Sequence, residues 1–344
     1  MKIDLMYNVD LNEDILREII SHADIQSVFR FYQVNKTLCH HQHDYLFHYI
    51  YQRLYIHTCM DVFKNKTSDM TWFQLLRLCY QLSRLFILLP SLQKYTMKSL
   101  YTMSELDLSH QKIKVLPPEM GQLRALQELF LYHNQLSALP PEIGQLSALQ
   151  YLDLSQNQLS AFPPEISHLN KLKELSLSYN QLSALPPEMG QLRALQRLSL
   201  SHNQLSTLPP EMGQLIHLQY LDLFRNQLST LPSEMCKLIS LQELYLSHNQ
   251  LSTLPPEMGQ LSALQRLSLS NNQLNALPPE IGRLSALQQL YLDHNQLSAL
   301  PPEMGQLSAL QYLTLSYNKS SCIFIKKLKQ QLPKVNVTMF KSKT

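Results

Sequence analysis

Long apolar runs and a strong net charge are both absent from this sequence of 344 residues. Its most apolar stretch, residues 75–89, is interrupted by two arginines and a glutamine and is too short to cross a bilayer. The opening residues place Asp4 before any sustained apolar core, so we expect no signal peptide. The net charge of +3 is too small to indicate nucleic-acid binding by itself. Composition therefore argues against a membrane protein.

Cysteine is scarce, and its spacing suggests neither a metal site nor a disulfide framework. The five cysteines are Cys39, Cys59, Cys79, Cys236 and Cys322. Cys39 is followed by three nearby histidines, but ligands crowded into five residues of a helix cannot all face one metal. Neither Cys59 nor Cys79 has a recognisable histidine and aspartate arrangement for nucleophilic catalysis. We therefore expect a reducing, cytoplasmic setting and a protein without metal, cofactor or catalytic residues.

What the sequence has in abundance is a repeat. Asparagine recurs every 23 residues, at Asn134, Asn157, Asn180, Asn203, Asn226, Asn249, Asn272, Asn295 and Asn318. In each unit, leucines such as Leu129 and Leu131 alternate with polar or aromatic residues, which is typical of a strand with one buried face. All seven glycines lie after such strands, in segments that carry a Pro-Pro pair suited to an extended return rather than to a strand ladder.

Residues 126–143 read Leu-x-x-Leu-x-Leu-x-x-Asn-Gln-Leu-x-x-Leu-Pro-Pro-Glu-Ile. This unit resembles the leucine-rich repeat family, and the resemblance covers residues 95–320 in ten successive copies. It implies an α/β solenoid with ten parallel strands in a concave sheet, on the order of 45 Å long at about 4.8 Å per strand. It also implies that each asparagine turns inward and hydrogen-bonds the backbone of adjacent coils. Residues 321–344 are predicted to be a cap and tail, with a helix at 325–333 and a final strand at 335–339.

If the repeats form strands, the side chains six, four, two and one residues before each asparagine point to the concave face. Eight acids lie there against three arginines, so this face carries a net charge near −5. An acidic face repels phosphate, whereas tyrosine supplies contact area at low entropic cost. We therefore predict a basic or mixed-charge protein partner, the alternative being a merely solvated face. The candidate substrate-binding residues are Phe130, Tyr132, Tyr151, Asp153, Tyr179, Arg197, Tyr220, Asp222, Phe224, Tyr245, Arg266, Tyr291 and Tyr312.

A histidine stands directly before the repeating asparagine or its equivalent in five units. These residues are His110, His133, His202, His248 and His294. Other residue types interrupt the series, so it is not a regular metal-binding ladder. We interpret these histidines as solvated side chains, with a pH-sensitive surface as the alternative.

The first ninety residues contain no glycine and no internal repeat, and they show helical periodicity. Residues 11–23 and the Val-Asn-Lys at residues 34–36 resemble the F-box family. The resemblance implies an all-α domain at residues 1–52, followed by a helical linker and cap at residues 53–94. It also implies docking onto the Skp adaptor of a cullin-RING ubiquitin ligase through Leu11, Ile15, Leu16, Ile19 and Val34. The alternative is a plain helical cap over the first leucine coil.

Three function classes compete. A substrate receptor of a ubiquitin ligase would tether the ligase through its N-terminal domain and hold a substrate on the solenoid. A scaffold would bind a protein with no link to ubiquitin. An enzyme, similar to bacterial effectors with a cysteine-based ligase domain, is disfavoured because about 26 residues follow Asn318. Nearly identical repeats beside an F-box-like region resemble effectors that intracellular bacteria deliver into the host cytoplasm.

Overall fold

The computed structural model describes residues 89, 91–92, 97–319 and 335–338. The chain divides into two compact units, Met1–Tyr101 and Thr102–Thr344. Helix α6 spans Met97–Thr102. The predicted F-box-like domain with its adaptor contacts, the helix at 325–333 and nearly all of the cap at 53–94 lie outside the described residues.

Each repeat contributes one short strand to a single parallel sheet, in which the strands follow their order in the chain. Equivalent residues of successive repeats stand opposite each other, as Leu129 does opposite Leu152. This arrangement confirms the predicted repeat solenoid, and the last strand lies within the one predicted at 335–339. The strands are β1 (Glu105–Asp107), β2 (Glu128–Phe130), β3 (Tyr151–Asp153), β4 (Glu174–Ser176), β5 (Arg197–Ser199), β6 (Tyr220–Asp222), β7 (Glu243–Tyr245), β8 (Arg266–Ser268), β9 (Gln289–Tyr291), β10 (Tyr312–Thr314) and β11 (Asn336–Thr338).

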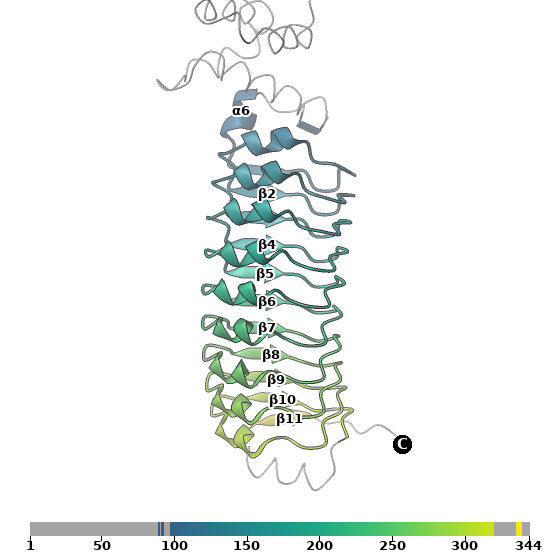
Figure 1. Ribbon diagram of the computed structural model, residues 1–344, viewed down its shortest axis with the longest axis vertical. Coiled ribbons are helices and arrows are strands. Elements are labelled where there is room, and N and C mark those ends of the chain that lie inside the picture. The colour runs from purple at the N-terminus through teal and green to yellow at the C-terminus, as the bar shows by residue number, and fades with distance from the viewer. Residues whose placement is uncertain (1–88, 90, 93–96, 320–334, 339–344) are drawn as a thin grey trace, which may run out of the picture. The chain divides into compact units, whose positions relative to one another are not determined.

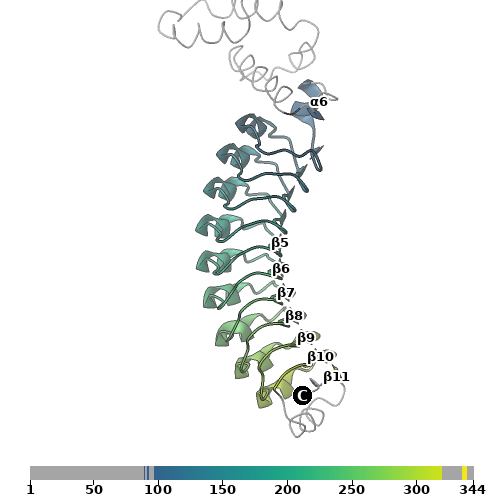
Figure 2. The same cartoon turned by 90° about the vertical axis from the view of Figure 1, so that its right-hand side faces the viewer.

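A 3-10 helix forms the opposite side of nearly every coil (Figure 1). Figure 2 shows that the coils of the unit Thr102–Thr344 stack in an arc, with the strands on its inner side and the 3-10 helices on its outer side. The sheet therefore forms the concave face. The 3-10 helices are η2 (Pro118–Gln122), η3 (Pro141–Gln145), η4 (Pro164–His168), η5 (Pro187–Gln191), η6 (Pro210–Gln214), η7 (Ser233–Lys237), η8 (Pro256–Gln260), η9 (Pro279–Arg283) and η10 (Pro302–Gln306).

The sequence suggested that the Pro-Pro pair keeps its segment extended. In the structure only the first proline is extended. In the second repeat Pro140 is extended, with φ −70° and ψ 146°, but Pro141 is already the first residue of η3. A proline fits this place because the first amide groups of a helix have no partner inside it. The return segment is therefore helical from its second proline onward.

Glycine in the 3-10 helices allows adjacent coils to approach closely. A Cβ atom on Gly144 would lie 2.3 Å from the carbonyl oxygen of Glu165 in the next coil. Real Cβ atoms do not come so close to backbone, so a side chain there would force the coils apart. Ser167 and Cys236 take this place in two coils and are buried, so those coils leave room for a side chain that the coil after Gly144 does not.

Leucines fill the space between the sheet and the 3-10 helices. Leu129, Leu131 and Leu136 are fully buried, and the equivalent leucines of the following repeats are buried as well. Burying such a side chain contributes about 1.5–3 kcal/mol. One coil cannot cover its own leucines, so the core exists only because neighbouring coils stack on it.

The repeating asparagines turn inward and bond the backbone of two coils. Asn157 is 8% exposed, and its Oδ1 accepts a hydrogen bond from the amide of Leu136 at 3.0 Å. Its Nδ2 donates to the carbonyls of Leu131 at 2.9 Å and Leu154 at 3.0 Å. These bonds recur from coil to coil and satisfy polar groups that would otherwise be buried without partners. The role implied by the family resemblance is confirmed.

Candidate functional site

Two rows of side chains cover the concave side of the sheet, because the central leucine of each strand points into the core. The first row consists of the first residues of β1 to β10, which are Glu105, Glu128, Tyr151, Glu174, Arg197, Tyr220, Glu243, Arg266, Gln289 and Tyr312. The second row consists of their third residues, which are Asp107, Phe130, Asp153, Ser176, Ser199, Asp222, Tyr245, Ser268, Tyr291 and Thr314. Ten of the predicted binding residues lie in these rows, and Tyr132, Tyr179 and Phe224 lie in the loops that follow the strands.

The residue types of the first row recur in a fixed order, which comparison of single repeats did not show. Tyrosine, glutamate and arginine follow one another on β3 to β5, and again on β6 to β8. Because the strands are in register, each of these side chains neighbours the next one in the row. Comparing every third repeat of the sequence would have found this block of three.

In the first block, Arg197 lies between an acid and an aromatic ring. Its Nε is 3.9 Å from the Oε2 of Glu174, and its guanidinium carbon is 4.2 Å from the ring centroid of Tyr220. An arginine over an aromatic face is stabilised by the ring quadrupole, by about 0.5–1 kcal/mol at an exposed site. The chain therefore holds this cation in a fixed place on the sheet.

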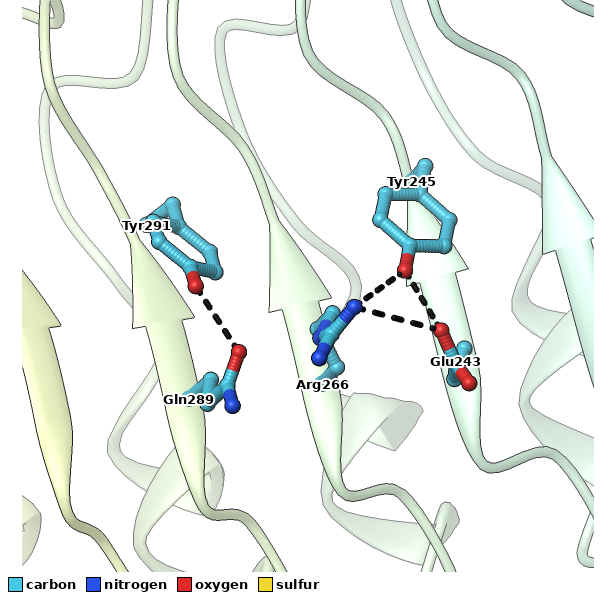
Figure 3. Close-up of polar contacts among 5 residues, drawn as sticks. All are labelled: Glu243, Tyr245, Arg266, Gln289 and Tyr291. Carbon is cyan, nitrogen blue, oxygen red and sulfur yellow. Dashed lines mark hydrogen bonds and ion pairs between the residues drawn. The ribbon is translucent and has the colours of Figure 1, made fainter.

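In the second block, Arg266 makes a closed set of polar contacts (Figure 3). Its Nη1 donates to the hydroxyl oxygen of Tyr245 at 2.8 Å and lies 3.6 Å from the Oε2 of Glu243. The Tyr245 hydroxyl donates to the same Oε2 at 2.5 Å. Beside them, Tyr291 donates to the Oε1 of Gln289 at 2.8 Å. These side chains restrain one another, so this surface is partly organised before any partner arrives.

Tyr220 and Tyr245 are hydrogen-bond donors at neutral pH. Burial first, and then the carboxylate of Asp222, raise the pKa of Tyr220 to about 12. Burial and the hydrogen bond to Glu243 likewise raise the pKa of Tyr245. Each hydroxyl therefore keeps its proton and presents a polar tip on an apolar ring.

Aromatic rings of adjacent strands also contact one another across the two rows. The ring centroids of Phe130 and Tyr151 are 5.1 Å apart, and those of Tyr220 and Tyr245 are 5.5 Å apart. Such pairs combine a large contact area with little freedom to lose on binding.

The aspartates of the second row have a structural task that the sequence did not reveal. Asp153 accepts a hydrogen bond from the amide of Ser155 at 2.9 Å, and Asp222 accepts one from the amide of Phe224 at 2.9 Å. Each carboxylate thereby binds the backbone where its strand ends. Replacing either aspartate would disturb this turn as well as the charge of the face.

The residue before each asparagine has a left-handed backbone, with φ of 55° at His133 and His202 and 57° at Tyr179. A strand points successive side chains to opposite faces. The left-handed residue interrupts this alternation, so it and the residue before it can both lie on the concave side. Histidine and asparagine tolerate this conformation better than most residues. Pattern analysis of the sequence missed the conformation, although the frequent histidine at this place was a signal of it.

Several of these left-handed residues pack along the loops together with Phe224. The ring centroids of Tyr179 and His202 are 3.9 Å apart and the rings are nearly parallel. The ring centroid of Phe224 lies 5.4 Å from that of His202 and 5.0 Å from that of His248. Burial, followed by the charge of Arg225, lowers the pKa of both histidines. His202 and His248 are therefore half-exposed side chains that also pack against aromatic rings.

No cluster of three acidic, histidine or cysteine side chains suited to a metal occurs in the described part of the chain. Within the same residues, no helix has both the length and the apolar character needed to cross a membrane. A hollow of about 230 Å³ lies on the 3-10 side and is lined by Pro210, Glu211, Gly213, Gln214, Glu234 and Lys237. The concave rows therefore remain the best candidate for a functional surface.

Comparison with known proteins points to one family. The sequence pattern described as "Leucine rich repeat" matches overlapping segments of the chain from residue 102 to residue 319. A leucine-rich repeat protein of Leptospira interrogans with a solved structure is 32% identical, with a TM-score of 0.35, and the match covers 70% of this chain and 91% of that one. No curated protein matches the sequence.

Two plant receptors are similar in structure. The plant peptide hormone receptor RGFR1, solved in complex with RGF2, is 30% identical with a TM-score of 0.59. The match covers 67% of this chain and 38% of the receptor. The ectodomain of the Arabidopsis thaliana receptor kinase GASSHO1/SCHENGEN3, in complex with Casparian strip integrity factor 2, is 32% identical with a TM-score of 0.54. Here the match covers 70% of this chain and 36% of that one, so this chain spans less than half of either receptor.

Proposed function

Because this chain belongs to the leucine-rich repeat family, we propose that it is a non-catalytic receptor that holds a protein segment on its concave face. The observation that carries the proposal is the pair of rows in which tyrosine and arginine are restrained by their neighbours. Tyrosine and arginine supply much of the binding energy at protein interfaces. The two plant receptors described above, solved with RGF2 and with Casparian strip integrity factor 2, give the proposal further support.

The charges of the rows favour a basic or mixed-charge partner. Arg197 and Arg266 each already lie beside a glutamate, whereas Glu105, Asp107 and Glu128 on β1 and β2 share the two rows with no basic residue on β1 to β4. A stretch of carboxylates without a basic residue in the same rows raises the local concentration of a cationic segment and speeds its association.

The finer part of the proposal concerns the N-terminal region. Residues 1–52 dock the chain onto a Skp adaptor and, through it, onto a cullin-RING ubiquitin ligase in the cytoplasm. The solenoid then holds a substrate near the ligase, which raises the effective concentration of ubiquitin at that substrate. Support for this step comes from the F-box-like sequence at residues 11–23 and 34–36. In the same proposal, the chain is a bacterial effector that acts in a host cell.

Pull-down of the purified full chain with a Skp adaptor tests the N-terminal step. The matched variant carries Leu16→Asp and Ile19→Asp, because both side chains belong to the resembling apolar stripe. Binding by the wild type that the variant loses supports a ligase receptor. A folded wild type that does not bind the adaptor leaves a scaffold whose N-terminal helices serve only as a cap.

Cross-linking in a host-cell lysate tests the concave face independently. A variant with Tyr220→Glu and Tyr291→Glu should lose the partners that the wild type captures, because both rings lie in the rows. A control with Gln214→Glu and Gln260→Glu adds the same charge at exposed positions of the 3-10 side and should keep them. Equal capture by all three proteins would refute binding at the concave face.

A further inference from the structure

The chain carries the same strand sequence twice, in two different electrostatic settings. Both β3 and β6 read Tyr-Leu-Asp, and a first-row glutamate follows each of them, on β4 and β7 respectively. The two settings differ in the preceding strand. Arg197 precedes Tyr220, whereas Glu128 precedes Tyr151. The first-row neighbours of Tyr220 are therefore Arg197 and Glu243, and those of Tyr151 are two glutamates.

At Tyr220 the chain itself provides the cation. The guanidinium carbon of Arg197 lies 4.2 Å from the ring centroid, and its Nε lies 3.9 Å from Glu174. A guanidinium is thus seated against the tyrosine face and next to a glutamate of the first row. This arrangement shows what the repeated surface accepts when a cation is present.

At Tyr151 an acid, Glu128, stands where Arg197 stands beside Tyr220. Phe130 takes the place of Ser199, and Glu105 on β1 takes the place of Glu174. Glu128 and Glu174 flank the tyrosine in register, and Phe130 contacts its ring at 5.1 Å. Burial first, and then the carboxylates of Asp153, Glu174 and Glu128, raise the pKa of the Tyr151 hydroxyl. Negative potential from three strands therefore converges on this ring.

The described basic residues near this place already have partners, and one of them pairs with Glu174, a neighbour of Tyr151. The nearest one in the first row is Arg197, two strands away and beside Glu174. Lys173 directs its Nζ to the Oε1 of Gln150, at 2.9 Å. Glu105 stands directly opposite Glu128, and like charges in that position disfavour each other. A bound cation would relieve this repulsion.

We propose that Tyr151, with Phe130, Glu105 and Glu128, forms a site for an arginine side chain of the bound protein partner. The inference rests on the proposed protein-binding function and adds to it the partner chemistry and the place of contact. The partner's guanidinium occupies, relative to Tyr151, the position that Arg197 occupies relative to Tyr220. The site anchors the partner at β1 to β3, while on β5 to β8 Arg197 and Arg266 already lie beside glutamates.

Fluorine NMR of the full chain labelled with 3-fluorotyrosine tests the site without any protein partner. The Tyr151 signal is assigned with Tyr151→Phe, and the probe is N-acetyl-arginine amide. Its neutral counterpart, N-acetyl-citrulline amide, is the ligand control. We expect a saturable shift of the Tyr151 signal with the arginine probe alone. The affinity should weaken about tenfold in Glu128→Arg, which removes an attractive charge and supplies an internal cation.

Two further variants sharpen the result. Glu142→Arg makes the same charge change on η3, away from the sheet, and should leave the titration unchanged. Arg197→Glu gives Tyr220 two glutamates as first-row neighbours, as Tyr151 has. The Tyr220 signal should then also show a saturable shift with the arginine probe. A Tyr151 signal that ignores the arginine probe, responds equally to citrulline or is unaffected by Glu128→Arg overturns the proposed site. These outcomes do not depend on partner capture, so they separate failure of this site from failure of the concave-face function.

Discussion

Replacing Asn226 by alanine probes the inward-facing asparagines at the middle of the solenoid. Asn226 is 7% exposed, and its Oδ1 accepts from the amide of Leu205 at 3.0 Å. Its Nδ2 donates to the carbonyls of Leu200 and Leu223, and each of these still accepts from a second asparagine. With alanine at position 226, the Leu205 amide loses the side-chain oxygen to which it donates its hydrogen bond. An orphaned buried donor costs about 1–3 kcal/mol, so with the two weakened carbonyls we expect a loss of about 2–4 kcal/mol.

Urea unfolding followed by circular dichroism measures this loss in the free energy of unfolding. Gln227→Ala is the matched control, because Gln227 is the exposed neighbour of Asn226 and should change stability by less than about 0.5 kcal/mol. Hydrogen exchange gives a local readout. The Leu205 amide should exchange faster in the Asn226 variant, whereas the Leu228 amide, bonded to Asn249, should not. A variant as stable as the control, with a protected Leu205 amide, would refute the reasoning.

Three further predictions concern stability and reactivity. Gly213→Ala should destabilise the protein by about 1–3 kcal/mol in urea unfolding, because the new Cβ would meet the carbonyl oxygen of Glu234 at 2.2 Å; an unchanged midpoint would contradict the close approach of the coils. Burial and a nearby arginine lower the pKa of His202, so its neutral form is favoured and stability should fall as pH drops below about 6.5. His202→Gln should reduce this fall between pH 7 and 5, and equal slopes would count against it. Burial raises the pKa of Cys236 to about 12, so iodoacetamide at pH 8 should modify it much faster after unfolding, as followed by peptide mass spectrometry.

The coil itself could be predicted because its positions meet the same surroundings in every repeat. The burial of Leu129 and the inward position of Asn157 follow from their period alone. The leucine lies in the core, and the asparagine hydrogen-bonds backbone groups that are buried there. The final strand was predictable from its alternation and lies beside β10. Identical neighbours on both sides make local pattern and tertiary structure agree.

The contacts on the concave face could be predicted only in part. Sequence placed Arg197 and Tyr220 on the same side, but their contact depends on which repeat precedes which and on the exact register between strands. The second proline was misread because proline suits both an extended segment and the start of a helix. The left-handed residues were missed because a strand pattern carries no information about where its backbone turns.

The block of three repeats has a consequence for how this molecule changes by recombination. Its two tyrosine–glutamate–arginine blocks lie in the same register and carry the same first-row residues. A genetic exchange that deletes residues 174–242 would place Glu243 beside Tyr151 in the first row. The parent chain already has a tyrosine beside this glutamate, at Tyr220. The first-row neighbours at the new junction would repeat a pair present in the parent chain, because a coil contacts its immediate neighbours in the stack. The first row can therefore shorten or lengthen by whole blocks and keep its order of residues, which makes the length of the binding face a heritable variable separate from its chemistry.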